Sequence, residues 1–576
     1  MIVWINLLDY TGCCSTLKYI CDRKLELSIK SAIALDHKSN PWKLTTKMTN
    51  KSAKKNSTNK KQKSFEESLW DSANKLRGSV EPSEYKHVVL SLIFLKFVSD
   101  VFEAQKQKII EIHGEQYVDM EAFYHKDSAF YLPEQSRWSY IVKNAKQDDI
   151  AVKIDKALYE IEKKNSSLSG ALPDNYFSRI DLEVSKLAAL LDEINNIQTI
   201  QNQHEDVVGR VYEYFLGKFA LAEGKGKGEF YTPKSIVNLI AEMIEPYKGR
   251  VYDPCCGSGG MFVQSMRFVE NHKGNRKDIA VYGQEQTTTT YKLAKMNLAV
   301  RGISANLGAA ARDTFAKDQH QDEKFDFIMA NPPFNQKDWR ADDELTDDPR
   351  WEGYDTPPTS NANYGWILHM ASKLSQNGVA GFILANGALS GDGTEKAIRA
   401  KLIENKIVEA VVILPRNMFY TTDISVTLWI LNRNKKARTV PHGDLTRHYR
   451  DRDDEILFMD LRQMGIPFEK KYIQLSRDEI EKITKTFHSW QETSYESEYK
   501  NIPEFCYSAN IEELRAKDHS LVPSKYVEFI NRDENIDFDK KMKNLQTEFA
   551  ELLKAEAKSK EELLYVFKEL GYEIRL

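Results

Sequence analysis

Apolar residues recur at helical intervals through the front of the chain. In SFEESLWDSANKLRG, Leu69, Ala73 and Leu76 share one helical face, and a glycine ends the pattern. Pro82 suits the first turn of the long helix that follows. Beyond it come a loop at 166–175 and helical stretches at 180–194 and 205–216. The spacing predicts a helical N-terminal domain over residues 64–200.

From about residue 224 the pattern changes to short apolar runs that alternate with helical segments. Six runs predict buried strands: RVYD (250–253), IAVYGQE (279–285), FDFIMA (325–330), VAGFILA (379–385), IVEAVVIL (407–414) and ISVTLWIL (424–431). Such alternation is typical of a mainly parallel sheet with helices on both faces. We therefore expect an α/β domain over residues 201–470, with its ligands beyond the carboxyl ends of the strands.

Charged helical patterns return in residues 471–576. One stripe combines Met542, Leu545, Phe549 and Leu552. This stripe suits packing either on the chain's own domain or on a partner helix. SKEE at 559–562 has the form of a capping box, which predicts the start of a separate last helix. We expect a C-terminal helical region.

The first 63 residues differ from the rest. Residues 1–47 show no clear periodicity, and Met48 opens a lysine-, serine- and asparagine-rich tail of disordered composition. We expect an atypical extension followed by a basic tail, with Met48 as the natural start. MIVWINLLDY has no basic region of the kind that begins a signal peptide.

Composition narrows the classes of function. The chain has 576 residues, enough for two to four domains, and a formal net charge of −4, so it has no overall attraction to nucleic acid. Six cysteines in this length do not form a disulfide scaffold, and Cys13, Cys14 and Cys21 lack zinc-site spacing. We expect a reducing cytoplasm and no metal. The most apolar run, 88–98, is too short for a membrane span and fits a buried helix face.

The first candidate site is the glycine-rich stretch VYDPCCGSGGMF. Gly257, Gly259 and Gly260 let the backbone approach a ligand closely, and Asp253 stands before them at a strand end. The stretch is not the G-x-G-x-x-G fingerprint of pyrophosphate binding. A carboxylate at this place suits a ligand with a cationic amino group.

Two more acids follow at successive strand ends. Glu285 can accept both hydroxyls of a ribose, and Asp313 could meet an adenine amino group. One such acid is as often a helix cap. Together with the glycine turn, the three acids favour a positively charged nucleoside, and S-adenosylmethionine fits that description.

The second candidate site is MANPPFNQ, which ends the strand after Asp313. Two prolines stop the strand and hold Asn331 stiffly at the sheet edge. The motif is either a structural turn or a site where the Asn331 oxygen and the Pro332 carbonyl accept both N–H groups of an exocyclic amine. Phe334 can stack on the base. Catalysis would then rest on positioning and fixed dipoles, and a base in double-stranded DNA must first be flipped out.

These motifs, in the order GEFYTP, DPCCGSGG and NPPF, resemble those of the amino-group DNA methyltransferases. More narrowly, the chain resembles the modification subunit of type I restriction–modification systems, from about residue 64 through the C-terminal helices. The resemblance implies a class I S-adenosylmethionine-dependent methyltransferase fold, Rossmann-like and α/β, with a helical N-terminal domain. It also implies S-adenosylmethionine-dependent methylation of adenine N6.

The resemblance also implies roles for residues of this sequence. Those implied around the cofactor are Glu229, Phe230, Tyr231, Thr232, Pro233, Lys234, Asp253, Gly257, Ser258, Gly259, Gly260, Glu285 and Asp313. Those implied for catalysis are Asn331, Pro332, Pro333 and Phe334. Glu229 stands where this family often has glutamine. Cys255 and Cys256 lie at a cofactor position, so we assign them to packing and not to the nucleophile role seen in cytosine-C5 methylation.

The sequence contains no obvious reader of base edges. The acidic insertion 335–363 is either a lid over the flipped base, with Trp339 or Trp351 as an aromatic wall, or an ordinary surface loop. The resemblance implies that a specificity subunit reads the DNA, that two modification subunits flank it, and that a restriction subunit joins for cleavage. We expect the C-terminal helices to dock the specificity subunit.

Three rival functions stay open at this point. Similar Asn-Pro-Pro-aromatic motifs serve enzymes that methylate glutamine in release factors or guanine in RNA. Cytosine-N4 methylation uses the same logic. A non-catalytic scaffold for DNA or a specificity subunit is the third, and intact Asp253, Glu285 and Asn331 speak against it.

Overall fold

The structure is a computed structural model. The chain divides into two compact units, Met1–Gln62 and Lys63–Leu576, and every described residue belongs to the second. The described residues are 70, 74, 82–126, 129–180, 182–196, 214–215, 218, 232–419, 425–442, 445–468, 472–493, 495, 498–530 and 538–569. The predicted extension, the basic tail and the helical stretch at 205–216 therefore lie wholly or largely outside the described residues.

A long helix organises the N-terminal helical region. The helices are α3 (Pro82–His113), α4 (Glu121–Lys126), α5 (Trp138–Lys143), α6 (Ile150–Lys164) and α7 (Val184–Asn195). The apolar run at 88–98 lies inside α3, and Val88, Leu92 and Leu95 are 0% exposed, so its prediction as a buried helix face is confirmed. No helix among the described residues combines the length and apolar character needed to cross a bilayer.

The second region is built on one nine-stranded sheet, in the order β13-β10-β6-β7-β5-β4-β1-β2-β3. Its strands are β1 (Gly249–Asp253), β2 (Ile279–Gly283), β3 (Ala305–Asn306), β4 (Phe325–Ala330), β5 (Leu374–Ala385), β6 (Val408–Ile413), β7 (Val426–Asn432), β10 (Glu455–Asp460) and β13 (Cys506–Asn510). All are parallel except β7 and β13. The six predicted strands are thus confirmed, and the antiparallel direction of β7 is a feature that the apolar pattern did not reveal.

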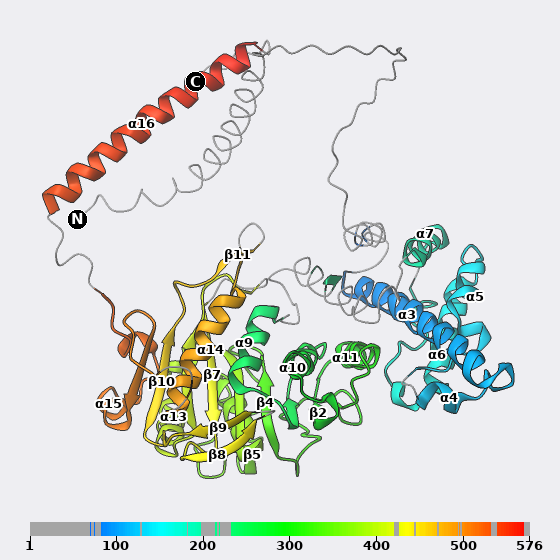
Figure 1. The fold of residues 1–576 in the computed structure, drawn as a ribbon, viewed down its shortest axis with the longest axis horizontal. Helices are drawn as coiled ribbons and strands as arrows, with labels where there is room; N and C mark the ends of the chain where they lie inside the picture. Colours follow the sequence, from blue (N-terminus) through cyan, green and yellow to red (C-terminus); the bar gives the residue numbers. More distant parts are fainter. Residues whose placement is uncertain are drawn as a thin grey trace, which may run out of the picture. The chain divides into compact units, whose positions relative to one another are not determined.

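Helices cover both faces of this sheet, as the alternating pattern predicted (Figure 1). One face packs against α9 (Lys234–Ile244), α10 (Gly260–Asn271) and α14 (Arg477–Gln491). The other packs against α12 (Asn363–Lys373) and α13 (Thr394–Glu404). The helix α11 (Thr288–Val300) has Leu293, Met296 and Val300 in the apolar core of the helical region, so it joins the two regions.

Two small ribbons and two further α-helices also belong to the described elements. The ribbons pair β8 (Arg438–His442) with β9 (Leu445–Tyr449) and β11 (Ile466–Phe468) with β12 (Tyr472–Gln474). The helices are α15 (Ile511–Ala516) and α16 (Phe538–Glu569). The predicted boundary near residue 470 is wrong, because β13 pairs with β10 and α14 covers the sheet. The helical pattern of α14 concealed this return to the sheet.

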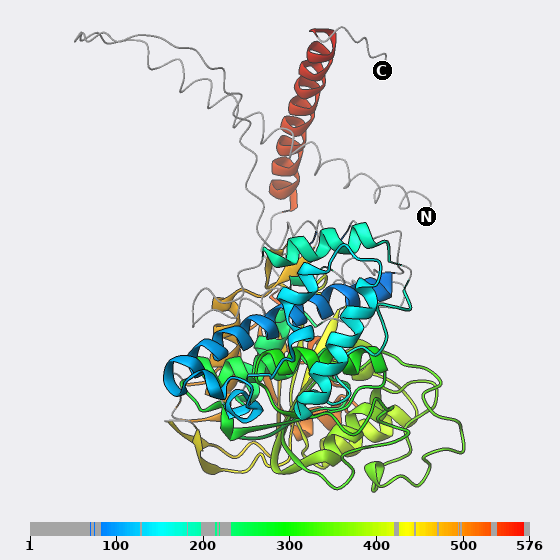
Figure 2. The same ribbon diagram turned by 90° about the vertical axis from the view of Figure 1, so that its right-hand side faces the viewer.

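The C-terminal helix α16 is one uninterrupted helix, visible in red in Figure 2. The prediction that SKEE begins a separate helix is therefore wrong: with no glycine or proline before it, Ser559 lies in the helix interior. The apolar stripe on α16 is exposed: Met542 by 40%, Leu545 by 49%, Phe549 by 63% and Leu552 by 66%.

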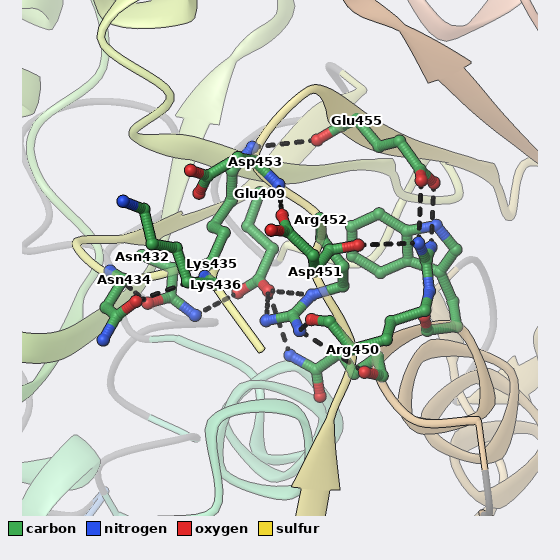
Figure 3. Close-up of polar contacts among 12 residues, drawn as sticks. Glu409, Asn432, Asn434, Lys435, Lys436, Arg450, Asp451, Arg452, Asp453 and Glu455 are labelled. Carbon is green, nitrogen blue, oxygen red and sulfur yellow. Dashed lines mark hydrogen bonds and ion pairs between the residues drawn. The ribbon is translucent and has the colours of Figure 1, made fainter. Parts of the chain in front are cut away.

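A group of buried polar side chains, drawn in Figure 3, lies where β6 begins, β7 ends and β10 begins, which is the amino edge of the sheet. We call Glu409, Asn432, Lys435 and Arg452 the basal cluster. Arg452 donates to one oxygen of Glu409 at 2.8 and 3.1 Å, and Asn432 donates to the other at 2.8 Å. Lys435 donates to the carbonyls of Val408 and Glu455. The cluster thus ties the start of β6 to the end of β7 and to the loop before β10.

Candidate active site

The candidate residues meet at the carboxyl edge of the sheet. Strands β1 and β4 are neighbours, but the chain passes through β2 and β3 between them, so the strand order reverses direction here. Crevices at such reversal points are the usual ligand sites of open parallel sheets. Asp253 is the last residue of β1, Asn331 directly follows β4, and Glu285 lies two residues beyond β2.

The glycine-rich turn between β1 and α10 leaves room for a ligand. Gly257 and Gly259 have φ angles of 53° and 81°, a region that glycine adopts without strain. A Cβ atom added at Gly257 or Gly260 would meet no atom of the described residues within 4 Å. On the other side of the turn, Asn297 of α11 donates to the Ser258 carbonyl at 2.7 Å. The turn is therefore supported from behind and open in front.

Asp253 is buried at the base of this turn, with 2% of its surface exposed. Its Oδ1 accepts from the Cys255 amide at 3.0 Å. Burial raises the pKa of Asp253 to about 7, because the charged form loses its hydration. A cationic group in the crevice would favour the ionised form, which is what the predicted role of Asp253 requires.

Glu285 holds the glycine turn against the end of β2. Its Oε2 accepts from the Gly257 amide at 3.0 Å, and its Oε1 accepts from the Thr287 amide at 2.8 Å. These two hydrogen bonds fix the Glu285 carboxylate beside the glycine-rich turn. Asp313 caps its own turn, since its Oδ1 accepts from the amides of Phe315 and Ala316 at 2.8 Å.

Gln284 is a supporting residue that sequence reasoning missed. It is 0% exposed, and its Nε2 donates to the carbonyls of Arg312 and Lys317 at 3.1 and 2.8 Å. Its Oε1 accepts from the Gln319 amide at 3.0 Å. Gln284 thus fixes the loop that carries Asp313 beside Glu285. The sequence signal of this role is weak: Gln284 directly precedes the strand-end acid Glu285.

Asn331 has its amide held in one orientation. Its Nδ2 donates to Thr232 Oγ1 at 3.0 Å. Its Oδ1 is buried and has no hydrogen-bond partner among the described residues. Leaving a buried acceptor unpaired is unfavourable, so a donor N–H group from a ligand at this edge of the sheet would suit the Asn331 oxygen.

Only Thr232, Pro233 and Lys234 of the GEFYTPK motif lie among the described residues. The Thr232 hydroxyl accepts from Asn331 of the NPPF motif, and the cofactor contact predicted for Thr232 stays a prediction. Pro233 is buried and precedes α9, and Lys234 is exposed as the first residue of that helix. Glu229, Phe230 and Tyr231 lie outside the described residues.

The rest of the NPPF motif is braced from two sides. Phe334 packs edge-on against Phe419, with ring centroids 5.8 Å apart. The Asn335 amide donates to Asn363 Oδ1 at 3.1 Å, and Asn363 Nδ2 donates back to Asn335 Oδ1 at 2.9 Å. The turn that presents Asn331 is therefore rigid on the side where a base would stack.

The insertion 335–363 is folded on itself. Trp339 and Trp351 are 9% and 3% exposed, and Trp339 Nε1 donates to the Pro358 carbonyl at 2.8 Å. The prediction of these two side chains as an aromatic wall over the base is therefore wrong, because they form the apolar interior of the insertion with Phe315. The sequence could not separate an exposed tryptophan from a buried one in so polar a segment.

Cys255 is partly exposed and Cys256 is buried beside the glycine-rich turn. Burial raises the pKa of both thiols well above the ordinary range, so neither forms a thiolate readily. This agrees with their assignment to packing.

Comparisons with known proteins support the family that the motifs resemble. A family model described as N-6 DNA methylase matches residues 203–535, which is more than half of the chain, and one described as the HsdM N-terminal domain matches residues 65–194. The HindI methylase subunit of a type I restriction enzyme, from Haemophilus influenzae, is 39% identical over 463 residues, or 77% of this chain and 100% of that protein. The MjaIX methylase subunit from Methanocaldococcus jannaschii is 33% identical over 529 residues, or 88% of this chain and 92% of that protein.

A solved structure agrees in fold. The methyltransferase subunit of a type I restriction-modification system from Streptococcus thermophilus superposes with a TM-score of 0.65 at 23% identity, covering 81% of this chain and 99% of that one. The predicted fold class, a class I methyltransferase with a helical N-terminal region, is confirmed. The predicted activity is supported over the three rivals. The chain therefore belongs to the N-6 DNA methylase family, among the methylase subunits of type I restriction enzymes.

Proposed function

We propose that Asn331 and Pro332 hold the N6 amino group of a target adenine during methyl transfer. The observation that carries the proposal is the Asn331 oxygen, which is buried without a partner among the described residues while its amide nitrogen is fixed by Thr232. An acceptor in this state suits a donor N–H group from a substrate.

In this proposal the protein forms no covalent bond to the substrate. The amino nitrogen of adenine is a weak nucleophile because its lone pair is delocalised into the ring. Two fixed acceptors on its N–H groups, the Asn331 oxygen and the Pro332 carbonyl, favour a pyramidal nitrogen with its lone pair directed at the methyl donor. Fixed dipoles of this kind need no reorganisation during the reaction. Phe334 and Pro333 would hold the plane of the base.

S-adenosylmethionine supplies the methyl group when it is bound, and the residues on the other side of the crevice fit it. Asp253 would bind its amino group and Glu285 its ribose hydroxyls. Asp313 would lie beside its adenine. The open space in front of Gly257 and Gly260 would receive it, with Ser258 and Gly259 completing the turn.

The substrate in this proposal is double-stranded DNA with the adenine flipped out of the stack. A specificity subunit would read the sequence, with two methylase subunits per specificity subunit and a restriction subunit added for cleavage. The exposed apolar stripe of α16 would dock the specificity subunit. We also propose a cytoplasmic location, because the cysteine usage suits a reducing compartment.

Co-expression tests the proposal. Cells that carry the chain with its specificity subunit should contain N6-methyladenine at one DNA sequence, read by long-read sequencing of the chromosome. Cells without the chain are the control. Unmodified adenines in both strains would refute the activity. Deleting residues 538–576 should abolish co-purification with the specificity subunit, and retained co-purification would refute the docking role of α16.

A further inference from the structure

The insertion 335–363 contains an arginine that reaches out of it. Arg350 Nη1 donates to the Thr314 carbonyl at 2.9 Å, and Nη2 donates to the Phe315 carbonyl at 2.7 Å. These carbonyls belong to the turn that begins at Asp313. The same guanidinium also pairs with Asp348 at 2.7 Å, so one side chain joins the insertion to the cofactor side of the crevice.

The contact continues to the glycine-rich turn. Thr314 is buried, and its Oγ1 donates to the Pro254 carbonyl at 2.6 Å. Pro254 directly follows Asp253 in the sequence. A continuous path therefore runs from Arg350 through Thr314 to the residue beside the buried acid of β1.

The two ends of the insertion are fixed to the target side. Asn335 and Asn363 exchange two hydrogen bonds, and the Ala362 amide donates to the Gln336 carbonyl at 2.9 Å. Asn335 directly follows Phe334 of the NPPF motif. The insertion is thus joined to both halves of the crevice: at its base to the target-base motif, and through Arg350 to the Asp313 turn.

The Arg350 contact is largely shielded from solvent. The side chains of Arg350 and Asp348 are 9% and 14% exposed, and the guanidinium lies over the rings of Trp351 and Phe315 at 5.0 and 5.8 Å. Burial alone would raise the pKa of Asp348, but the hydrogen bonds and charge of Arg350 outweigh it and hold that pKa below its ordinary value. The pair is therefore ionised at neutral pH. A planar guanidinium can serve a carboxylate and two carbonyls together, and a lysine ammonium cannot match that geometry.

We propose that Arg350 is a positioning residue for the cofactor, and that the insertion braces the cofactor side of the crevice against the target side. Arg350 holds the carbonyls of Thr314 and Phe315, which fixes the Asp313 turn and, through Thr314, the glycine-rich turn. This rests on the proposed function only in assigning the Asp313 turn to the cofactor.

Arg340 provides a matched control within the same insertion. Its guanidinium donates to the carbonyls of Ala341, Asp342, Glu344 and Pro357, all inside the insertion, and it lies over Trp339 at 5.5 Å. Arg340 therefore resembles Arg350 in charge, size and number of contacts, but it does not reach the cofactor side.

The test is calorimetric binding of S-adenosylhomocysteine to the full chain. Arg350→Ala and Arg350→Lys should each weaken binding by about tenfold, the equivalent of roughly one well-placed hydrogen bond to the ligand. Thr314→Val, which breaks the same path at its other end, should weaken binding similarly, and Thr314→Ser should restore it. The double variant Arg350→Lys, Thr314→Val should weaken binding by less than the product of the two single fold-changes, because both substitutions break the same path. Arg340→Ala should leave binding within twofold of the wild type.

Equal binding by the Arg350→Lys and Arg340→Ala variants would overturn the proposal, and so would multiplicative effects in the double variant. A lower melting temperature shared by the Arg340 and Arg350 variants reports only the folding of the insertion and does not affect this comparison. Failure of the methylation proposal is seen separately, since wild-type chain that binds S-adenosylhomocysteine but methylates no DNA would refute that activity while leaving the Arg350 result intact.

Discussion

The two edges of the central sheet both bury charged and amide side chains, but these side chains have different hydrogen-bond and charge partners at each edge. At the amino edge, the basal cluster surrounds Glu409 with Arg452 and Asn432, and each carboxylate oxygen accepts a hydrogen bond (Figure 3). At the carboxyl edge, the Asn331 oxygen has no partner among the described residues, and Asp253 has no cationic partner among its described contacts.

The pKa values follow the same division. Burial alone would raise the pKa of Glu409, but Arg452, Asn432 and Lys435 outweigh it and hold that pKa below the ordinary value. Burial raises the pKa of Asp253 to about 7, since no comparable partner opposes it. The amino edge is therefore a completed ionic structure that stabilises the fold. At the carboxyl edge the buried Asn331 oxygen and Asp253 have no comparable partners among the described residues, which fits the ligand contacts proposed for them.

Removing the charge of Glu409 should have the largest effect on stability. Glu409→Gln leaves the buried Arg452 guanidinium without a counter-charge, which should lower the free energy of unfolding by about 3–5 kcal/mol. Urea titration of the full chain measures this. Glu481→Gln is the control, because Glu481 pairs with Lys485 on the exposed surface of α14 and should change stability by less than about 1 kcal/mol. Equal stability of the two variants would contradict the structural role of the basal cluster.

Asp253 should make cofactor binding depend on pH. Its carboxyl must lose a proton before it can pair with a cationic amino group, so below about pH 7 the affinity of the wild type for S-adenosylmethionine should fall by about tenfold per pH unit. Calorimetric titrations between pH 5.5 and 8.5 measure this. Asp253→Asn should bind more weakly at pH 8 and show no such slope. An identical slope in both proteins would exclude Asp253 as its source.

The raised pKa of Asp253 also predicts how the stability of the fold changes with pH. The folded-state pKa of about 7 lies above the ordinary aspartate value of about 3.9, so the folded protein binds this proton more tightly than the unfolded chain. The wild type should therefore lose stability relative to Asp253→Asn as the pH rises from about 4 to about 7. Melting temperatures of both proteins across this range test the sign, and the opposite trend would refute the burial argument.

Of the three residues changed so far, Glu409, Asp253 and Thr232, we expect the smallest effect at Thr232. Thr232→Val removes the acceptor that orients the Asn331 amide, so the methyl-transfer rate should fall by about tenfold, the effect of roughly one hydrogen bond. Thr232→Ser keeps the hydroxyl and should restore the rate. Binding of S-adenosylhomocysteine should be unchanged in both. If Thr232→Val instead weakened cofactor binding at an unchanged rate, the cofactor contact first predicted for Thr232 would be favoured.

The comparison of the two edges also explains which features the sequence could predict. At the carboxyl edge, Asp253 ends β1, Asn331 directly follows β4 and Glu285 lies two residues beyond β2, so the apolar pattern and the strand directions were enough to place all three at one edge. The basal cluster joins Glu409 to Arg452, 43 positions away, and nothing local marks either residue as a partner of the other.

Features that depend on distant partners were missed for the same reason. The Thr232–Asn331 hydrogen bond spans 99 positions, and the pairing of β13 with β10 follows a long helix. Arg350 stands in an acidic, irregular insertion, where sequence alone does not show which arginine reaches the Asp313 turn. Apolar periodicity indicates which residues are buried, and it gives no information about the polar partner that each one meets.

The measurement that tests the central claim most directly is the single-turnover rate of methyl transfer by Asn331→Ala, in complex with its specificity subunit and at saturating S-adenosylmethionine. Because the Asn331 oxygen is proposed to act only on the target adenine, the rate should fall by about a hundredfold to a thousandfold, the range known for loss of a single group that stabilises a transition state. S-adenosylhomocysteine binding and the melting temperature should match the wild type. Methyl transfer at a rate within tenfold of the wild type would contradict the account.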